Sequence, residues 1–137
     1  MNNPTFVNGD RALIRLRDVS KVYRRGQESI RALDAIDLTV LARGLVAIVG
    51  PSGSGKSSLL HLIGAMDRPT TGEVIVAGQS LNALSEAGLT TFRSKTVGFV
   101  FQSFNLIPNL SALENVMLPM EFDGVPRPER HRTPSAA

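Results

Sequence analysis

The fold is decided by residues 45–66, which read LVAIVGPSGSGKSSLLHLIGAM. The stretch begins with a continuous apolar run, Leu45–Val49, typical of a strand that is covered on both faces of a parallel sheet. A glycine- and serine-rich segment follows at once. Beyond it, apolar residues recur at the spacing of one helix face, at Leu59, Leu62, Ile63 and Met66. Because strand, loop and helix come in this order, the sequence predicts an α/β fold.

The loop between these two elements is suited to binding phosphate. Residues 50–57 match the pattern G-x-x-x-x-G-K-[ST] in full, between a strand and a helix as the pattern requires. The glycines at 50, 53 and 55 are expected to adopt positive φ, so that successive backbone N–H groups point into one anion-sized hollow. The helix beginning near Gly55 adds the positive end of its dipole.

Two side chains of the loop carry the remaining chemistry. Lys56 should reach the β and γ phosphates of a nucleoside triphosphate, and the hydroxyl of Ser57 should coordinate Mg²⁺. The alternative, a plain glycine and serine turn that caps a helix, leaves Lys56 unexplained. The sequence therefore predicts ATP and Mg²⁺ as cofactors. The residues expected to contact ATP in this loop are Gly50, Pro51, Ser52, Gly53, Ser54, Gly55, Lys56, Ser57 and Ser58.

Composition narrows the class of protein further. The 137 residues are 42% hydrophobic and 20% charged, which is typical of one globular domain. A net charge of +3 is too small an excess to indicate nucleic-acid binding. The absence of cysteine excludes disulfides and thiolate metal sites. No apolar run approaches the roughly 18 residues that span a bilayer, so we expect any membrane contact to be peripheral.

The segments before the loop predict a small β region. Apolar and polar residues alternate in 14–19, with Val19 one step out of phase, and again in 36–40. Both read as half-buried strands, paired antiparallel across the polar stretch 24–29. Val74 and Val76 mark a further short strand after the helix, which Pro69 and Gly72 are expected to end.

The second half of the chain predicts two more helices and one strand. Ser85 is expected to cap a short helix, and the apolar stretch Val97–Phe101 reads as another buried strand that closes at Gln102. Ser111 and Glu114 have the spacing of a capping box at the start of a second helix. From residue 126 onward the sequence has no periodicity and is expected to be a disordered tail.

At this point the sequence resembles a known family. The residues that carry the resemblance are Tyr23, the loop 50–58, and the stretches 66–74, 97–102 and 114–119. They are similar to the ATP-binding subunits of ATP-binding cassette (ABC) transporters, above all to those that serve lipoprotein release and macrolide export. The resemblance covers about residues 13–124. It implies a P-loop NTPase fold of ABC type, with an N-terminal antiparallel β region and an incomplete parallel sheet with helices.

The resemblance also implies a domain organisation and further site residues. It places a partial ATP-binding domain at residues 1–125, followed by the tail at 126–137. Tyr23 matches the aromatic residue that stacks on adenine, although a tyrosine just after a strand is, taken alone, more often a packing residue. Gln102 matches the glutamine that touches Mg²⁺ and the attacking water, although a glutamine at a strand end is usually solvated. Ser57 and Gln102 would thus share the metal.

The family's partners follow from the same resemblance. The region after Gln102, residues 104–108, lies where family members meet the cytoplasmic helices of a transmembrane subunit; a loop folding back on the core is the alternative. Full-length members pair with a second ATP-binding subunit. The implied function is to couple ATP binding and hydrolysis to export or lipoprotein release, in the cytoplasm and peripheral to the inner face of the cell membrane.

Several motifs of the family are missing from the 137 residues. They are the LSGGQ signature, the Walker B aspartate, the glutamate that activates water and the switch histidine, and no residue is assigned a catalytic role. Because phosphoryl transfer needs metal, positioned water and charge stabilisation together, we expect binding without appreciable turnover. A non-catalytic ATP-binding or interaction protein stays an alternative. A P-loop kinase is disfavoured, because more than 40 residues precede the loop here, whereas such kinases usually have it after their first strand.

Overall fold

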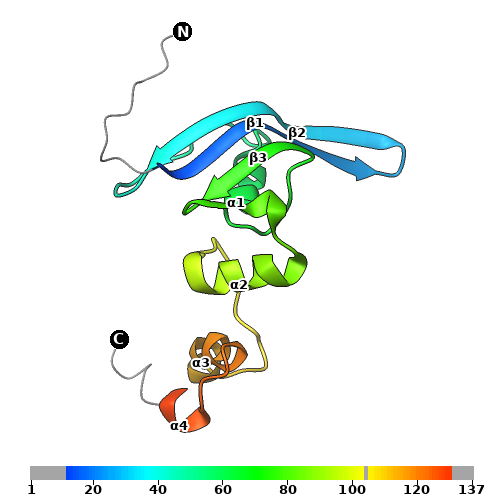
Figure 1. The fold of residues 1–137 in the computed structure, drawn as a ribbon. Helices are drawn as coiled ribbons and strands as arrows, with labels where there is room; N and C mark the ends of the chain where they lie inside the picture. Colours follow the sequence, from blue (N-terminus) through cyan, green and yellow to red (C-terminus); the bar gives the residue numbers. More distant parts are fainter. Residues whose placement is uncertain (1–11, 104, 131–137) are drawn as a thin grey trace. The chain divides into compact units, whose positions relative to one another are not determined.

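The computed structural model describes residues 12–103 and 105–130, which form two compact units. The first unit ends at Val97 and the second begins at Gly98. In Figure 1 the first unit is a twisted sheet with helices against one face, and the second consists of helices and their connections. The predicted phosphate loop belongs to the first unit.

A long antiparallel hairpin dominates the first unit. It consists of β1 (Ala12–Arg25) and β2 (Glu28–Leu41), joined by a turn at Gly26 and Gln27. Both predicted half-buried strands lie inside these longer elements, and the predicted connection at 24–29 contains the turn. The antiparallel pairing inferred from alternation is therefore confirmed.

Two shorter strands complete the described sheet. β3 (Thr71–Val76), predicted from its valines, pairs with the other edge of β1, and β4 (Gln79–Ser80) pairs with β3. The order is β2-β1-β3-β4, and each of these pairings is antiparallel. The pairing register of β1 shifts between Leu16 and Val19, both of which are buried. This bulge explains why Val19 is out of phase and still reaches the core.

The core of the first unit lies between the sheet and two helices, α1 (Lys56–Ile63) and α2 (Glu86–Thr96). Each fully buried aliphatic side chain contributes about 1.5 to 3 kcal/mol relative to an exposed one. The sheet supplies Leu16, Val19, Leu33, Val74 and Val76, the helical segments supply Leu62, Leu81, Leu89 and Phe92, and the turn after α1 supplies Ala65. The hairpin and the helix that follows the phosphate loop therefore share one core.

Helix α1 begins where the sequence predicts and ends earlier. Gly55 is its N-cap, and Gly64 is its C-cap, with the Gly64 N–H donating to the carbonyl of Leu60 at 2.8 Å. The predicted end near Pro69 is wrong, and Met66 lies beyond the helix and is exposed. The cause is local, because Ala65 adopts a φ of 57° and turns the chain out of the helix.

Helix α2 begins at the predicted cap. The Ser85 hydroxyl accepts a hydrogen bond from the N–H of Gly88 at 3.2 Å, which satisfies one of the free donors of the first turn. A single 3₁₀ turn, η1 (Leu81–Ala83), precedes it. Leu89 and Phe92 are buried, so the face inferred from their spacing is the face that packs on the core.

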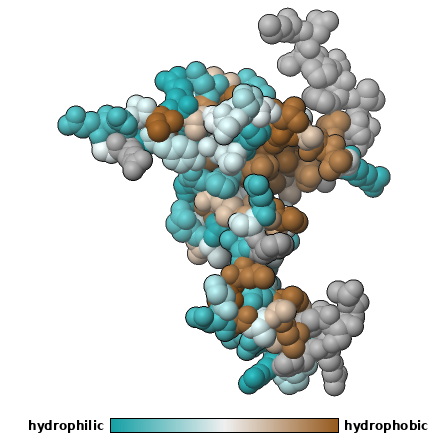
Figure 2. All heavy atoms as spheres, turned by 180° about the vertical axis from the view of Figure 1, so that it is seen from behind, coloured by the Kyte–Doolittle hydropathy of each residue, from teal (hydrophilic) through white to brown (hydrophobic). Residues whose placement is uncertain are grey.

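The two predicted buried strands do not form. Leu45–Val49 has no strand assignment, and the side chains of Leu45 and Val49 are 98% and 86% exposed. Val97–Phe101 is likewise not a strand, and Val100 is fully exposed. A buried strand needs neighbours that pair with its N–H and C=O groups, and no strand among the described residues pairs with either segment. Hydrophobic side chains consequently reach the surface in the view of Figure 2.

The second unit is built around α3 (Ala112–Phe122). The predicted capping box is confirmed, since the Glu114 carboxylate accepts from the Ser111 N–H at 2.8 Å and the Glu114 N–H donates to the Ser111 hydroxyl at 3.3 Å. Before the helix, the rings of Phe99 and Phe101 stack with centroids 5.7 Å apart.

The predicted tail is partly helical. α4 (Arg127–Arg130) follows Pro126, and the Arg130 guanidinium pairs with the carboxylate of Glu121 on α3 at 2.7 Å. The expectation of disorder from residue 126 is therefore wrong for this short helix, which has a partner that its own sequence does not reveal. The rest of that expectation, residues 131–137, lies outside the described residues. None of the helices in 12–103 and 105–130 has the length and apolar character of a transmembrane segment.

Candidate functional site

The predicted phosphate loop leads directly into the first turn of α1. Gly53 and Gly55 have φ of 79° and 87°, which confirms two of the three glycines expected to need positive φ. The expectation is wrong for Gly50, whose φ lies outside that range. Glycine fits there for a different reason, because an added Cβ would lie 2.8 Å from the Ser54 hydroxyl oxygen. The loop is thus tightly folded on itself.

Gly55 also joins the loop to the hairpin. A Cβ at this position would lie 2.4 Å from the carbonyl oxygen of Ala32 on β2 and 3.0 Å from the side chain of Leu33. Only a residue without a side chain allows this close approach. The start of α1 is therefore held against β2, and the position of the loop depends on a contact between residues more than 20 positions apart.

The contact with Ala32 makes Gly55→Ala the more damaging of two otherwise similar substitutions. Both Gly53→Ala and Gly55→Ala place a side chain at positive φ, which costs about 1 to 2 kcal/mol of folding free energy. Nothing lies within 4 Å of a Cβ at Gly53, so that variant measures backbone strain alone. Gly55→Ala should lose about 1 to 3 kcal/mol more, from the clash with backbone. Urea unfolding of both variants measures the difference, and equal losses would contradict the contact.

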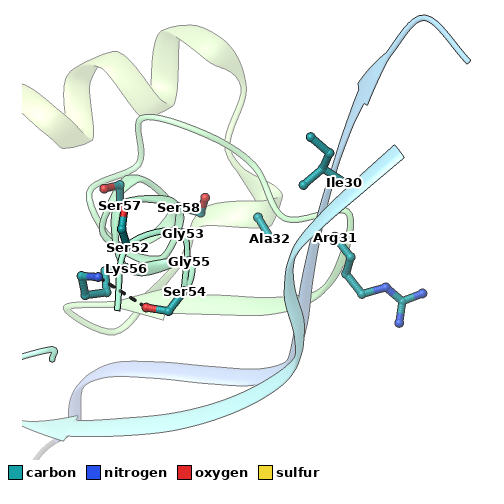
Figure 3. A pocket seen from close by; sticks show the side chains of 10 residues that line it. All are labelled: Ile30, Arg31, Ala32, Ser52, Gly53, Ser54, Gly55, Lys56, Ser57 and Ser58. Carbon is teal, nitrogen blue, oxygen red and sulfur yellow. Dashed lines mark hydrogen bonds between the residues drawn. The ribbon is translucent and has the colours of Figure 1, made fainter. Parts of the chain in front are cut away.

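Lys56 folds back over the loop. Its ammonium donates to the carbonyl oxygens of Gly50 and Pro51 at 2.8 and 2.6 Å and lies 3.4 Å from the Ser54 hydroxyl, the last contact being drawn in Figure 3. These acceptors are neutral. Among the described residues no carboxylate forms an ion pair with Lys56. The loop therefore holds a positive charge that is not neutralised, as a site for an anion requires.

An open hollow of about 390 Å³ lies along the loop. One wall is formed by the loop and the first turn of α1, residues 52–58, and the other by Ile30, Arg31 and Ala32 of β2. In Figure 3 the side chain of Ala32 points toward the loop, whereas the guanidinium of Arg31 points away from it. The structure thus brings together most of the predicted ATP contacts, with Gly50 and Pro51 bound to the Lys56 ammonium beside them.

Sequence analysis missed the wall formed by β2. One signal was available, because residues 24–29 predict a hairpin and its register sets Ile30 opposite Tyr23. Once Tyr23 is assigned to a nucleotide base, its cross-strand neighbour becomes a candidate as well. The approach of Ala32 to the loop has no comparable local signal.

The proposed metal ligands lie in different units. Ser57 is in the first turn of α1, lines the hollow and is exposed, and its hydroxyl has no hydrogen-bond partner within 12–103 and 105–130. A hydroxyl without a partner beside this hollow fits the oxygen ligand that Mg²⁺ would take from the protein. Gln102 belongs to the second unit and is exposed. The shared metal therefore stays a prediction.

Tyr23 is fixed by two side chains. Its hydroxyl donates to the Asp67 carboxylate at 3.1 Å, and the ammonium of Lys21 lies 4.9 Å from its ring centroid. The tyrosine still exposes 37% of its surface. It does not line the hollow itself but sits opposite Ile30, which does. Its role in stacking stays a prediction.

Asp67 is the centre of the contacts around Tyr23. Partial burial would raise the pKa of its carboxyl group, but hydrogen bonds from the Lys21 ammonium, the Arg68 N–H and the Tyr23 hydroxyl outweigh this and lower the pKa. The Lys21 ammonium is 2.6 Å from the carboxylate. Asp67 is therefore a carboxylate at neutral pH.

Of the predicted partner-contact segment, Phe104 lies outside the described residues. Leu106 and Ile107 are 60% and 43% exposed. The side-chain amide of Asn115 on α3 holds this loop, accepting from the Ile107 N–H at 2.8 Å and donating to the carbonyl oxygens of Ile107 and Leu110. The two apolar side chains are thus presented at the surface by a loop that is bound to a helix, rather than buried by folding back within the second unit.

Comparison with known proteins decides the family. A sequence profile described as "ABC transporter" matches residues 33–136, which is most of the chain and includes the loop and the Gln102 region. The chain belongs to the ABC transporter family. This result supports the resemblance drawn from the motifs and does not favour a P-loop kinase.

Two of the relatives of this ABC transporter chain have names that state the transport process they serve. The lipoprotein-releasing system ATP-binding protein LolD of Chromohalobacter salexigens is 44% identical over 128 residues, covering 93% of this chain and 54% of that protein. The macrolide export ATP-binding/permease protein MacB of Hyphomonas neptunium is 45% identical over 118 residues, covering 86% of this chain and 18% of that protein. The subgroup expected from the sequence is thereby confirmed.

A solved structure supports the fold. The ATP-binding cassette MJ0796 of Methanocaldococcus jannaschii, in a dimeric post-hydrolysis state bound to ADP and Pi, aligns with a TM-score of 0.77 at 45% identity. The alignment covers 87% of this chain and 53% of that cassette. The predicted P-loop fold of ABC type is therefore confirmed. The chain spans about half the length of LolD and of the cassette.

Proposed function

We propose that this chain is the ATP-binding part of an ABC transporter subunit that couples ATP binding and hydrolysis to export or lipoprotein release by a membrane partner. The observation that carries the proposal is the ammonium of Lys56. It is held in a glycine loop at the start of α1, without a carboxylate partner among the described residues, beside a hollow of about 390 Å³.

The proposed ligand is ATP with Mg²⁺. The phosphates would lie in the loop, where the N-terminal end of α1 and the charge of Lys56 both favour an anion. Ser57 and Gln102 would hold the metal, which when bound neutralises part of the phosphate charge. The Lys56 ammonium would then donate its hydrogen bonds to phosphate oxygens instead of the loop carbonyl oxygens. The adenine would stack on Tyr23.

The proposed partners are a transmembrane subunit and a second ATP-binding subunit. The exposure of Leu106 and Ile107, on a loop held by Asn115, supports an apolar contact with the first. The dimer of the similar cassette MJ0796 supports the second. The names of the LolD and MacB relatives support lipoprotein release or macrolide-type export as the driven process. The chain would then act in the cytoplasm, at the inner face of the membrane.

Replacing Tyr23 by alanine tests whether the base is recognised. Stacking on an aromatic ring is worth about 1 to 3 kcal/mol, and every purine has a π-face. We therefore expect Tyr23→Ala to weaken ATP, ADP and GTP alike, by roughly 5- to 150-fold in dissociation constant. Inorganic triphosphate has no base and should bind both forms equally. Titration calorimetry measures all four ligands, and an equal loss for triphosphate would make Tyr23 a packing residue.

A further inference from the structure

The carboxylate of Asp67 connects the end of α1 with the predicted base-recognition residue. Its Oδ1 accepts from the Lys21 ammonium at 2.6 Å and from the Arg68 N–H at 2.7 Å, and its Oδ2 accepts from the Tyr23 hydroxyl at 3.1 Å. Lys21 and Tyr23 both belong to β1, 46 and 44 residues away in sequence. One side chain thus holds two neighbours of the same strand.

The ring of Tyr23 is restrained at two places by this arrangement. Asp67 fixes the hydroxyl, and the Lys21 ammonium lies 4.9 Å from the ring centroid. Lys21 is itself held firmly: its side chain is only 12% exposed, and it donates to the carbonyl of Arg68 at 2.7 Å as well as to Asp67. A change in the ring's orientation would break a hydrogen bond to a charged group and a cation–π contact.

A turn residue with a purely local role would not need these contacts. Asp67 accepts from the N–H of Arg68, and that bond alone would explain an aspartate after a helix. The bonds to Lys21 and Tyr23 go further, because they reach across to β1, where Tyr23 lies opposite Ile30, a residue that lines the hollow. Within residues 12–103 and 105–130, the second carboxylate oxygen accepts only from the Tyr23 hydroxyl.

We propose that Asp67 is a positioning residue for base recognition, which fixes the ring of Tyr23 in the orientation that stacks on the nucleotide base. The proposal rests on the proposed role of Tyr23 as the stacking residue. A ring that is already oriented loses less conformational entropy when the base binds, because the free protein has already restricted its rotation. Asp67 acts through Tyr23 and does not touch the phosphates.

Two variants separate the positioning role from the stacking role. Tyr23→Phe keeps the ring and loses only the bond to Asp67, and Asp67→Ala also releases Lys21 from its ion pair. We expect each to weaken ATP by about 3- to 10-fold and to leave inorganic triphosphate unchanged. Glu73→Gln is the matched control: it removes a carboxylate paired with Arg17 at 3.7 Å on the sheet, away from the hollow, and should change neither ligand.

A spectroscopic readout reports the ring directly. Tyr23 is the only tyrosine of the 137 residues and there is no tryptophan, so tyrosine fluorescence comes from one side chain. Its fluorescence anisotropy should fall in Asp67→Ala and stay unchanged in Glu73→Gln. A carboxylate that only closes the turn after α1 would leave the anisotropy of the ring unaltered.

The double variant decides between direct and indirect action. In a Tyr23→Ala background, Asp67→Ala should cause no further loss of ATP affinity, because no ring is left to position. A further loss of the same size would overturn the proposal, as would unchanged ATP affinity in Tyr23→Phe. If Asp67→Ala fails to fold, Tyr23→Phe alone decides. If Tyr23→Ala itself leaves ATP affinity unchanged, base stacking fails and the positioning role fails with it.

Discussion

Lys56→Ala is expected to weaken MgATP binding by roughly 10- to 150-fold in dissociation constant. The variant removes the ammonium that is proposed to donate a charge-assisted hydrogen bond to phosphate, a contact worth about 1.5 to 3 kcal/mol. In the free protein the ammonium already donates to the carbonyl oxygens of Gly50 and Pro51 at 2.8 and 2.6 Å. The free energy that Lys56 contributes to binding is therefore the difference between its hydrogen bonds to neutral carbonyl oxygens and those to charged phosphate oxygens. Titration calorimetry on both forms measures the loss.

The chain offers a matched control for this substitution. Lys95 lies in the last turn of α2, is exposed and does not line the hollow. Lys95→Ala removes the same charge from the chain and should leave MgATP affinity unchanged, because the charge of an exposed side chain outside the hollow is screened by water and salt. Equal affinities of the Lys56→Ala variant and the parent would refute the role of Lys56. An equal loss of MgATP affinity in both variants would show that the effect comes from the net charge of the chain and not from the position of Lys56.

Local patterns predicted the elements whose stability is local. The alternation in β1 and β2 reports which face meets the core, and the caps at Ser85 and Ser111 satisfy donors within the same helix turn. The loop pattern likewise predicted the positive φ of Gly53 and Gly55, which is a local property of the backbone. In each case the pattern that made the prediction lies within a short stretch of the sequence.

The features that the sequence did not predict depend on distant partners. Leu45–Val49 has the composition of a buried strand, but a strand is stable only where neighbours pair with it, and no described strand does so. The approach of Ala32 to Gly55 and the bond between Tyr23 and Asp67 join residues 23 and 44 positions apart. No periodicity or spacing encodes such contacts, so only the folded chain shows them.

The 137-residue chain, purified alone, is expected to be marginally stable. Leu45, Val46, Val49 and Val100 are exposed by more than half, and exposed apolar segments without paired backbone promote association and proteolysis. We therefore expect aggregation or ready cleavage in the absence of ligand. Limited proteolysis should cut first within residues 42–50, 97–103 and 105–106, which lie outside helices and strands.

MgATP should protect the chain, because a ligand that binds only the folded form stabilises it. At a concentration of 100 times the dissociation constant the gain is about 2.7 kcal/mol, which slows cleavage through global unfolding roughly 100-fold. Lys56→Ala should lose most of this protection at the same concentration, whereas Lys95→Ala should keep it. Equal protection of the parent, Lys56→Ala and Lys95→Ala would show that ATP stabilises the chain without binding at the loop.

Turnover by the same preparation should be indistinguishable from that of Lys56→Ala. The loop residues are proposed to bind and orient phosphate, but hydrolysis also needs a group that positions water and groups that stabilise the developing charge. The 137 residues contain neither an LSGGQ signature nor, after Gln102, four apolar residues followed by aspartate and glutamate. A phosphate-release assay together with gel filtration of the same preparation tests the expected lack of turnover and the expected marginal stability. Steady, Lys56-dependent release from a stable monomer would contradict them together, because it would require catalytic groups among the residues present.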